Sequence, residues 1–290
     1  MKLTGVGVWS MHLGSGDPGE VAEAVVELEE LGFNAAWIPE GAGKPFEAID
    51  RLLSVTHRRV VATGILNVWL HTPAETADAY ARLSTEGRFL LGLGASHAMV
   101  VDGAEPGRYR KPLATMTAYL DELDKVDTPV PVGGRVLAAL GPKMLEVAAN
   151  RSRGVHPYLV TPEHTRGARE IVGADALVLP EQTVILCADR AQARTIATDW
   201  LKLYLSLPNY ANNLRRLGLT DEDLTTVSDR LFDALIAWGD EEAILRRVAE
   251  HQAAGADHVA LQVLTPDPLN PNSAFPREQW RRLGAALASE

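Results

Sequence analysis

The chain has 290 residues, of which 46% are hydrophobic and 23% charged, and its formal net charge is −10. This composition is typical of a globular protein with a large core, and the length fits one α/β barrel, so we expect a single domain over residues 1–290. The negative charge and the lack of a long Lys or Arg run argue against nucleic-acid binding. The start MKLTGVGVW has no apolar signal core, and no run approaches about eighteen apolar residues, so we expect a cytoplasmic protein without a membrane span.

Eight apolar segments are predicted strands, and helical patterns lie between most of them. In chain order the strands cover residues 3–9, 34–40, 60–68, 89–95, 135–140, 154–160, 183–188 and 258–264. Their nearly continuous apolar character indicates a parallel sheet that is buried on both faces. Eight such units predict a (β/α)8 TIM barrel, and an open doubly wound sheet is the alternative.

A doubly wound sheet would carry a glycine-rich dinucleotide motif between a strand and a helix. The segment GLGASH (92–97) has GxG but lacks the third glycine, and we expect no helix directly after it. The barrel is therefore the preferred fold. A helical insertion over residues 189–257 separates the seventh and eighth strands, and it is long enough to cover the barrel mouth or to form an interface.

Three helix starts are legible in the sequence. Asp17-Pro18, Thr72-Pro73 and Thr161-Pro162 each place a capping side chain before a proline at the first helical position. Thr72 and Glu75 also have the spacing of a capping box.

Gly64 interrupts the third predicted strand, RVVATGILNVW (59–69), where a side chain would normally pack. A glycine at such a place indicates a bulge or the close approach of another group.

Barrel enzymes build their sites at the carboxyl ends of the strands, which directs attention to three titratable residues. His12 follows the first strand, Glu40 ends the second, and His97 follows the fourth beside a small, permissive Gly94-Ala95-Ser96 stretch. We take these three as candidate catalytic residues. The alternatives are a surface role for His12 and a turn-capping role for Glu40.

The segment AALGPKMLEVAA (138–149) indicates an anion site. Gly141 ends a strand, Pro142 opens a helix and Lys143 lies in its first turn, where a positive charge opposes the helix dipole unless an anion is bound. A second helix start at Thr161–Arg166 could close on the same anion. Two ordinary caps with a solvated lysine are the alternative. No cluster has metal-ligand spacing, and neither a GxSxG motif nor a P-loop is present.

Several segments occur in an order and at a spacing that resemble those of a known protein family, and this resemblance extends over essentially the whole chain. These segments are GVGVW, LGFNAAWIPEG, VATGILNVW, STEGRFLLGLGASH, RYRKPLATMTAYLDELD, LAALGPKMLEVAA, GVHPYLVTPEHT and WLKLYLSLPNYANNLRRLG. The chain is similar to the luciferase-like flavin and deazaflavin oxidoreductases, and within them to the branch dependent on coenzyme F420.

The resemblance implies a cofactor site, a homodimer and a small-molecule substrate. The bond between Gly64 and Ile65 would be a non-prolyl cis peptide that forms a bulge behind the deazaflavin ring. The phosphate would lie against the two helix starts. The implied cofactor-binding residues are Gly64, Ile65, Leu66, Asn67, Gly94, Ala95, Ser96, Gly141, Pro142, Lys143, His156, Pro157, Thr161, His164 and Thr165.

Two departures bear on the reaction. Relatives that oxidise alcohols or sugars often have a histidine where this chain has Gly41, and a glutamate where it has His97. We therefore expect His97 to exchange the proton, with Glu40 or His12 orienting it, while hydride moves between coenzyme F420 and an alcohol, a carbonyl compound or an activated double bond. The alternatives are a monooxygenase that uses FMN, a deazaflavin-binding protein without turnover, and a cofactor-free isomerase or aldolase.

Overall fold

The computed structural model describes residues 3–40, 44–270 and 273–289, and its core is a parallel sheet. Eight strand positions make up the sheet in the order expected. They are β1 (Gly5–Trp9), β2 (Ala35–Ile38), β3 (Val60–Thr63) with its continuation β4 (Leu66–Asn67), β5 (Phe89–Gly94), β6 (Arg135–Leu137), β7 (Gly154–Val155), β8 (Leu177–Val178) with its continuation β9 (Glu181–Ile185), and β11 (His258–Val263).

The segment that contains β8 and β9 closes the sheet into a barrel. On one side, the N–H groups of Leu179 and Glu181 donate to the carbonyls of Val155 and Pro157. On the other side β9 pairs in parallel with β11 through Ala260↔Glu181 to Val263↔Val184. Because this segment is bonded on both edges, the ends of all eight strands meet at one mouth, and the predicted barrel is confirmed.

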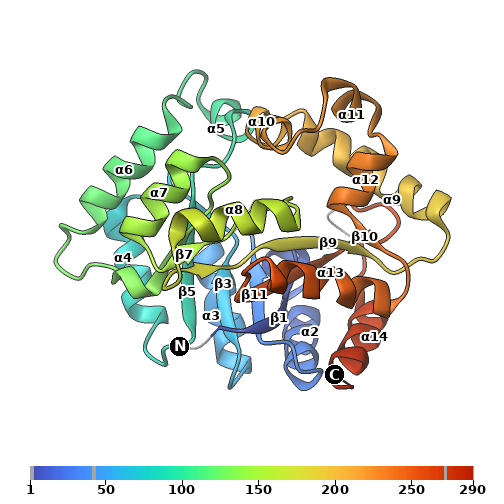
Figure 1. Cartoon of the computed structure of the whole chain (residues 1–290). Helices are drawn as coiled ribbons and strands as arrows, with labels where there is room; N and C mark the ends of the chain where they lie inside the picture. The colour runs from blue at the N-terminus through green and yellow to red at the C-terminus, as the bar shows by residue number, and fades with distance from the viewer. Residues whose placement is uncertain (1–2, 41–43, 271–272, 290) are drawn as a thin grey trace.

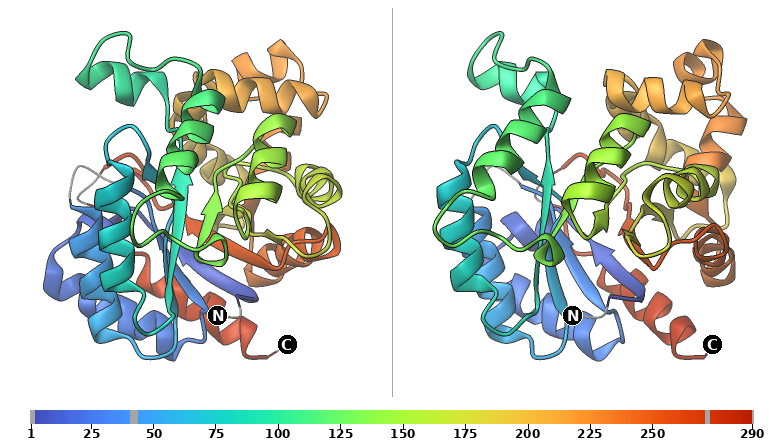
Figure 2. Two further views of the ribbon diagram at one scale, coloured as in Figure 1. Left: turned by 90° about the vertical axis from the view of Figure 1, so that its left-hand side faces the viewer. Right: turned by 60° about the vertical axis from the view of Figure 1, so that its left-hand side comes forward.

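Helices surround the sheet (Figures 1 and 2). The outer ring consists of α2 (Pro18–Glu30), α3 (Pro45–Val55), α4 (Pro73–Leu83), α6 (Pro112–Leu123), α7 (Pro142–Arg151), α8 (Pro162–Val172), α13 (Glu241–Ala253) and α14 (Arg277–Leu287). The three predicted starts are confirmed: Asp17 caps α2, Thr72 forms the capping box of α4 with Glu75, and Thr161 caps α8.

Two details differ from the sequence expectations. The seventh strand starts before residue 183, because Glu181 and Gln182 are buried with their polar atoms hydrogen-bonded, which a polarity pattern cannot reveal. A short helix, α5 (Ala98–Ala104), follows GLGASH directly with His97 at its N-cap, so the expectation of no helix there was wrong. Two further short pieces are α1 (His12–Ser15) and the 3-10 turn η1 (Val132–Gly134).

The insertion forms a helical roof with a hydrophobic cluster of its own. It contains α9 (Arg190–Leu205), α10 (Pro208–Arg216), α11 (Asp221–Thr226), α12 (Asp229–Leu235) and the short strand β10 (Ala237–Trp238), which pairs with β9. Buried apolar side chains of these helices pack with Leu159, Ile185 and Leu264 of the barrel. Figure 1 shows α10 beside α5 at the same end of the molecule. The last part of 189–257 is α13, which belongs to the outer ring.

No helix in the part of the chain that the structure describes is both long and apolar enough to cross a membrane.

A buried carboxylate of α2 fixes the connection from α3 to β3 at the opposite end of the barrel from the mouth. Glu29 is 7% exposed and accepts hydrogen bonds from the backbone N–H groups of His57, Arg58 and Arg59 at 2.7–3.2 Å. Burial raises the pKa of this carboxyl, but the three N–H donors and the Arg59 guanidinium outweigh it, so its pKa lies below the ordinary value.

We expect Glu29→Gln to lower the free energy of unfolding by about 1–3 kcal/mol at pH 7, because a neutral amide with one acceptor oxygen replaces a charged acceptor with two. A depressed folded-state pKa stabilises the protein above the unfolded pKa, and this stabilisation disappears as pH falls through the folded value. The difference between the two proteins should therefore shrink below about pH 4. Urea unfolding at several pH values measures it, with Glu30→Gln on the exposed side of the same helix as the control. A loss that is independent of pH would contradict this role for the carboxylate.

Candidate functional site

The interruption at Gly64 faces the barrel mouth, and its bond to Ile65 is cis, as expected. The Trp9 indole Nε1 donates to the Gly64 carbonyl at 3.1 Å. A side chain at Gly64 would place Cβ only 2.7 Å from Trp9 Nε1 and 3.0 Å from His156 Nε2. The glycine is therefore needed for packing against Trp9 and His156, whatever else lies above it.

His156 is buried beneath this bulge and is held in one orientation. Its Nδ1 donates to the Leu179 carbonyl at 2.7 Å, and its ring stacks on Trp37 at 4.1 Å between centroids. Burial lowers the pKa of His156 to about 4, so the ring is neutral. Its Nε2 has no hydrogen-bond partner in the described part of the chain.

Ile65 lies in a space that two small residues create. A Cβ at Gly94 would approach the Ile65 side chain to 2.5 Å and Ala138 to 3.3 Å, so glycine is required there. Leu66 and Asn67 are buried in β4, which pairs with Leu93 and Gly94 of β5.

The loop after β5 is tied to neighbouring aromatic residues. The Trp69 indole donates to the carbonyl of Ala95 at 2.8 Å, and the Tyr109 hydroxyl donates to the carbonyl of Ser96 at 3.2 Å. Ser96 has a positive φ of 54°. This loop directs His97 toward the helical roof.

Both carboxylate oxygens of Glu40, at the end of β2, accept hydrogen bonds from neighbouring residues. Its Oε2 accepts from the backbone N–H of Asn67 at 2.5 Å, and its Oε1 accepts from His71 Nε2 at 2.6 Å. His71 was not anticipated. Gly41, at which the sequence departs from alcohol-oxidising relatives, lies outside the described residues.

His97 lies between the barrel and the insertion. Its ring is 5.4 Å from that of Tyr210 on α10. Burial lowers the pKa of His97, and a hydrogen bond with Asn209 partly offsets this shift. A histidine with a lowered pKa is neutral near pH 7 and can accept a proton. Within the described residues, neither Glu40 nor His12 hydrogen-bonds to His97.

His12 lies on another side of the mouth. Its Nε2 is 3.0 Å from the Ser273 hydroxyl, and its ring contacts Phe275 edge-on at 6.0 Å. The structure therefore separates the three candidate catalytic residues into three clusters around one mouth.

Three tyrosines that the sequence reasoning did not select form a connected group over the mouth. Tyr158 follows β7, and Tyr204 and Tyr210 come from the insertion, with ring centroids 5.4–6.1 Å apart. Tyr158 also contacts Trp9 at 5.1 Å. Burial raises the pKa of all three hydroxyls, which therefore stay protonated. No local signal in LYLSLPNY indicates that this stretch folds back over the barrel.

Glu181 is a second residue that was missed. Its side chain is fully buried and accepts from the Leu159 N–H at 3.0 Å and the Thr183 hydroxyl at 2.6 Å. Burial raises the pKa of Glu181 to about 7.

The predicted anion site gains a cation from the insertion. Gly141 is the N-cap of α7, and no side chain among the described residues caps this helix. The Arg216 guanidinium of α10 lies 3.5 Å from where a Gly141 Cβ would stand. Pro142 and Lys143 are exposed in the first turn. An uncapped helix N-terminus between two cations is suited to an anion.

The second helix start contributes less than expected. Thr161 and His164 are buried beside Leu140: the Thr161 hydroxyl caps α8, and His164 Nε2 donates to the Leu140 carbonyl at 2.9 Å. His164 Nδ1 has no partner in the described segments, and its pKa is lowered by burial. The Thr165 hydroxyl is 2.8 Å from His251 Nδ1 in the interior, so its side chain does not face the anion site. Pro157 takes part through its carbonyl in closing the barrel.

Comparison with known proteins agrees with this architecture. A protein of Mycobacterium tuberculosis, provisionally named a coenzyme F420-dependent oxidoreductase, is 26% identical over 91% of this chain and 95% of its own length. The solved coenzyme F420-dependent tetrahydromethanopterin reductase of Methanopyrus kandleri has a TM-score of 0.74 and 17% identity, with 98% of both chains covered. A type II Baeyer–Villiger monooxygenase of Pseudomonas putida, solved with FMN, has a TM-score of 0.66 and 13% identity, with 99% of this chain and 97% of that chain covered.

The sequence model of the family described as "Luciferase-like monooxygenase" matches residues 3–126 and 123–258. Together these segments span most of the barrel and the insertion. The chain therefore belongs to the luciferase-like monooxygenase family.

Proposed function

We propose that this protein is an oxidoreductase that transfers a hydride between coenzyme F420 and a small organic substrate. The observation that carries the proposal is the anion site, in which the uncapped start of α7 faces the guanidinium of Arg216 beside the barrel mouth. A phosphate-bearing cofactor meets the two requirements of such a site, negative charge and several acceptor oxygens. The name of the Mycobacterium tuberculosis relative supports deazaflavin as its ring.

The residues at the mouth fit a flat ring next to that phosphate. Gly64 and Ile65 are only partly buried, so backbone lies open at the mouth above the rigid pair Trp9 and His156. Lys143 and Arg216 would hold the phosphate, while Gly64 to Asn67 would support the ring. When bound, the deazaflavin supplies a carbon centre that gives or takes a hydride.

Proton movement would fall to His97. It is neutral near pH 7, adjoins Asn209 and Tyr210, and is partly covered by α10. The buried tyrosines, which stay protonated, keep that side of the mouth uncharged and hydrogen-bonding. The roof helices would exclude water around the reacting atoms. A homodimer remains a prediction.

The rival function keeps the fold and replaces the deazaflavin by FMN, as in the Pseudomonas putida structure. FMN carries a phosphate that could use the same helix start. The direct test is to titrate the purified protein with coenzyme F420 and, separately, with FMN, following fluorescence. We expect F420 to bind more tightly. Preference for FMN would favour a monooxygenase, and binding of neither would refute the cofactor site.

We expect Arg216→Ala to raise the Kd for F420 about tenfold or more, because one charge-assisted contact to phosphate is lost. Added salt should weaken wild-type binding more than binding by the variant, since the lost contact is ionic and exposed. The matched control is Arg215→Ala, because Arg215 pairs with Asp221 at 2.7 Å instead. Equal affinities for wild type and Arg216→Ala would remove Arg216 from the cofactor site.

We expect His97→Asn to lower kcat/KM about 10²- to 10⁴-fold at pH 7 while leaving the Kd for F420 nearly unchanged, as for loss of a general base. Because burial lowers the pKa of His97, wild-type activity should decline only below pH 6.5, its ordinary value, as the ring is protonated. This acidic decline should be absent from the variant. Exposed His57, altered to Asn, is the control. An unchanged pH profile in His97→Asn would assign the proton step to another group.

A further inference from the structure

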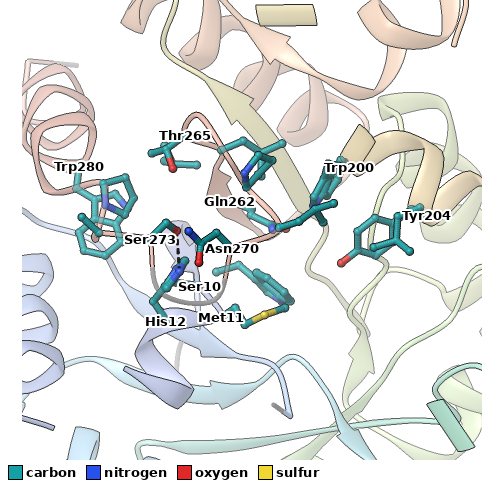
Figure 3. A pocket seen from close by; sticks show the side chains of 18 residues that line it. Ser10, Met11, His12, Trp200, Tyr204, Gln262, Thr265, Asn270, Ser273 and Trp280 are labelled. Carbon is teal, nitrogen blue, oxygen red and sulfur yellow. Dashed lines mark hydrogen bonds between the residues drawn. The ribbon is translucent and has the colours of Figure 1, made fainter. Parts of the chain in front are cut away.

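A cavity of about 240 Å³ opens beside the mouth, away from the anion site. It lies between the ends of β1 and β11, the loop that follows β11, and helix α9 of the insertion. Figure 3 shows Trp200 and Tyr204 of α9 on one side, with His12, Ser273 and Trp280 on the other. Neither Lys143 nor Arg216, which we propose hold the phosphate, is among the residues that line this cavity.

The cavity walls are largely apolar, and His12 is the only basic side chain among the described lining residues. Indole rings come from Trp9, Trp200 and Trp280, and aliphatic surface from residues such as Leu203 and Leu264. Among the described lining residues there is no Asp, Glu, Lys or Arg. An ammonium group placed there would find no carboxylate, and a phosphate or carboxylate would find no basic group other than the His12 imidazole, which already contacts Ser273, so burial of either kind of ion is unfavourable.

Two polar groups lie side by side in the cavity wall. The Tyr158 hydroxyl is 2.6 Å from Gln262 Oε1 and 3.2 Å from the Tyr204 hydroxyl. Tyr158 has one proton and an amide oxygen only accepts, so the Tyr204 proton serves the second contact. The Tyr204 oxygen is left as an acceptor, and Gln262 Nε2 has no hydrogen-bond partner in the described segments. A donor and an acceptor thus stand next to each other in an apolar space.

The cavity adjoins the place proposed for the ring. Trp9 lines the cavity, and its Nε1 bonds the Gly64 carbonyl of the bulge. A molecule in the cavity would therefore lie one indole width from the Gly64–Asn67 segment. Hydride transfer requires the reacting carbons to come within about 3–3.5 Å of each other, so the reactive end of such a molecule would have to reach past the edge of Trp9 to the ring.

We propose that this cavity binds the organic substrate, and that the substrate is an uncharged, mainly hydrocarbon molecule whose single oxygen accepts a hydrogen bond from Gln262 Nε2 and, where that oxygen is a hydroxyl, also donates one to the Tyr204 oxygen. The identification of this ligand as the substrate rests on the proposed function. The chemistry of the ligand comes from the walls of the cavity alone.

The test uses four probes with one ring frame: cyclohexanone, cyclohexanol, cyclohexanecarboxylate and cyclohexylamine. Saturation-transfer NMR on the full-length protein, with and without F420, measures binding directly, without turnover. Cyclohexanone and cyclohexanol should bind, and the two charged probes should bind at least tenfold more weakly. Equal binding of charged and neutral probes, or binding of none in either state, would overturn the proposal.

Two variants locate the binding. Gln262→Met keeps the side-chain length but removes the amide, and should weaken cyclohexanone binding about tenfold. Leu203→Trp changes a residue that is 37% exposed on α9, so folding should tolerate it while the larger ring fills the cavity and blocks all four probes. The control is Gln252→Met on the exposed side of α13. Unaltered probe binding in both cavity variants would place the probes elsewhere.

Titration of F420 with the same variants separates the two proposals. Neutral probes that bind to a protein unable to bind F420 would uphold the cavity and refute the proposed function. Tight F420 binding without any neutral-probe binding would support the cofactor site of the proposed function and refute the proposal for the cavity.

Discussion

The hydrogen bonding of one short segment, residues 177–185, determines where everything else in the site can lie. This segment bonds to the β7 side through Leu179 and Glu181 and to β11 through its parallel register. A parallel sheet with no open edge must bring all its carboxyl ends to one rim. Trp9, Gly64, His97 and Gly141 are far apart in sequence, and this closure is what gathers them around one mouth.

The second constraint is the packing of the insertion. Helices α9 to α12 share a hydrophobic cluster with Leu159 and Leu264 of the barrel, so buried apolar surface holds the roof against the barrel. This anchoring brings Tyr204, Tyr210 and Arg216 to positions that the barrel strands cannot supply. The site is therefore shared: the barrel provides backbone and helix starts, and the insertion provides aromatic cover and a cation.

Charge is distributed unequally around the mouth. At the centre, burial keeps His156 neutral and the hydroxyls of Tyr158 and Tyr210 protonated. Cationic groups lie at the rim, on Lys143 and Arg216 next to the start of α7. A low-dielectric centre disfavours ions, whereas a solvated rim tolerates them. This separation is what a ligand with a phosphate tail and a neutral reactive end needs.

The sequence by itself determined the features that depend on neighbouring residues. The caps at Asp17, Thr72 and Thr161, the helix start at Pro142 and the interruption at Gly64 were all legible, because a cap or a bulge is set within a few residues. The eight apolar strands also predicted the barrel, because a parallel sheet buried on both faces has a characteristic pattern.

Only the tertiary structure decided the contacts made across the fold. The strand start at Glu181 was hidden because buried polar groups pair with partners such as Leu159, which no polarity pattern contains. Asn209 beside His97 and Arg216 beside Gly141 were missed for the same reason: the path of the insertion depends on the packing of its apolar faces against the barrel. Caps and bulges depend on neighbouring residues and can be predicted from the sequence. The residues that a site side chain contacts across the fold depend on which distant surfaces are buried against each other.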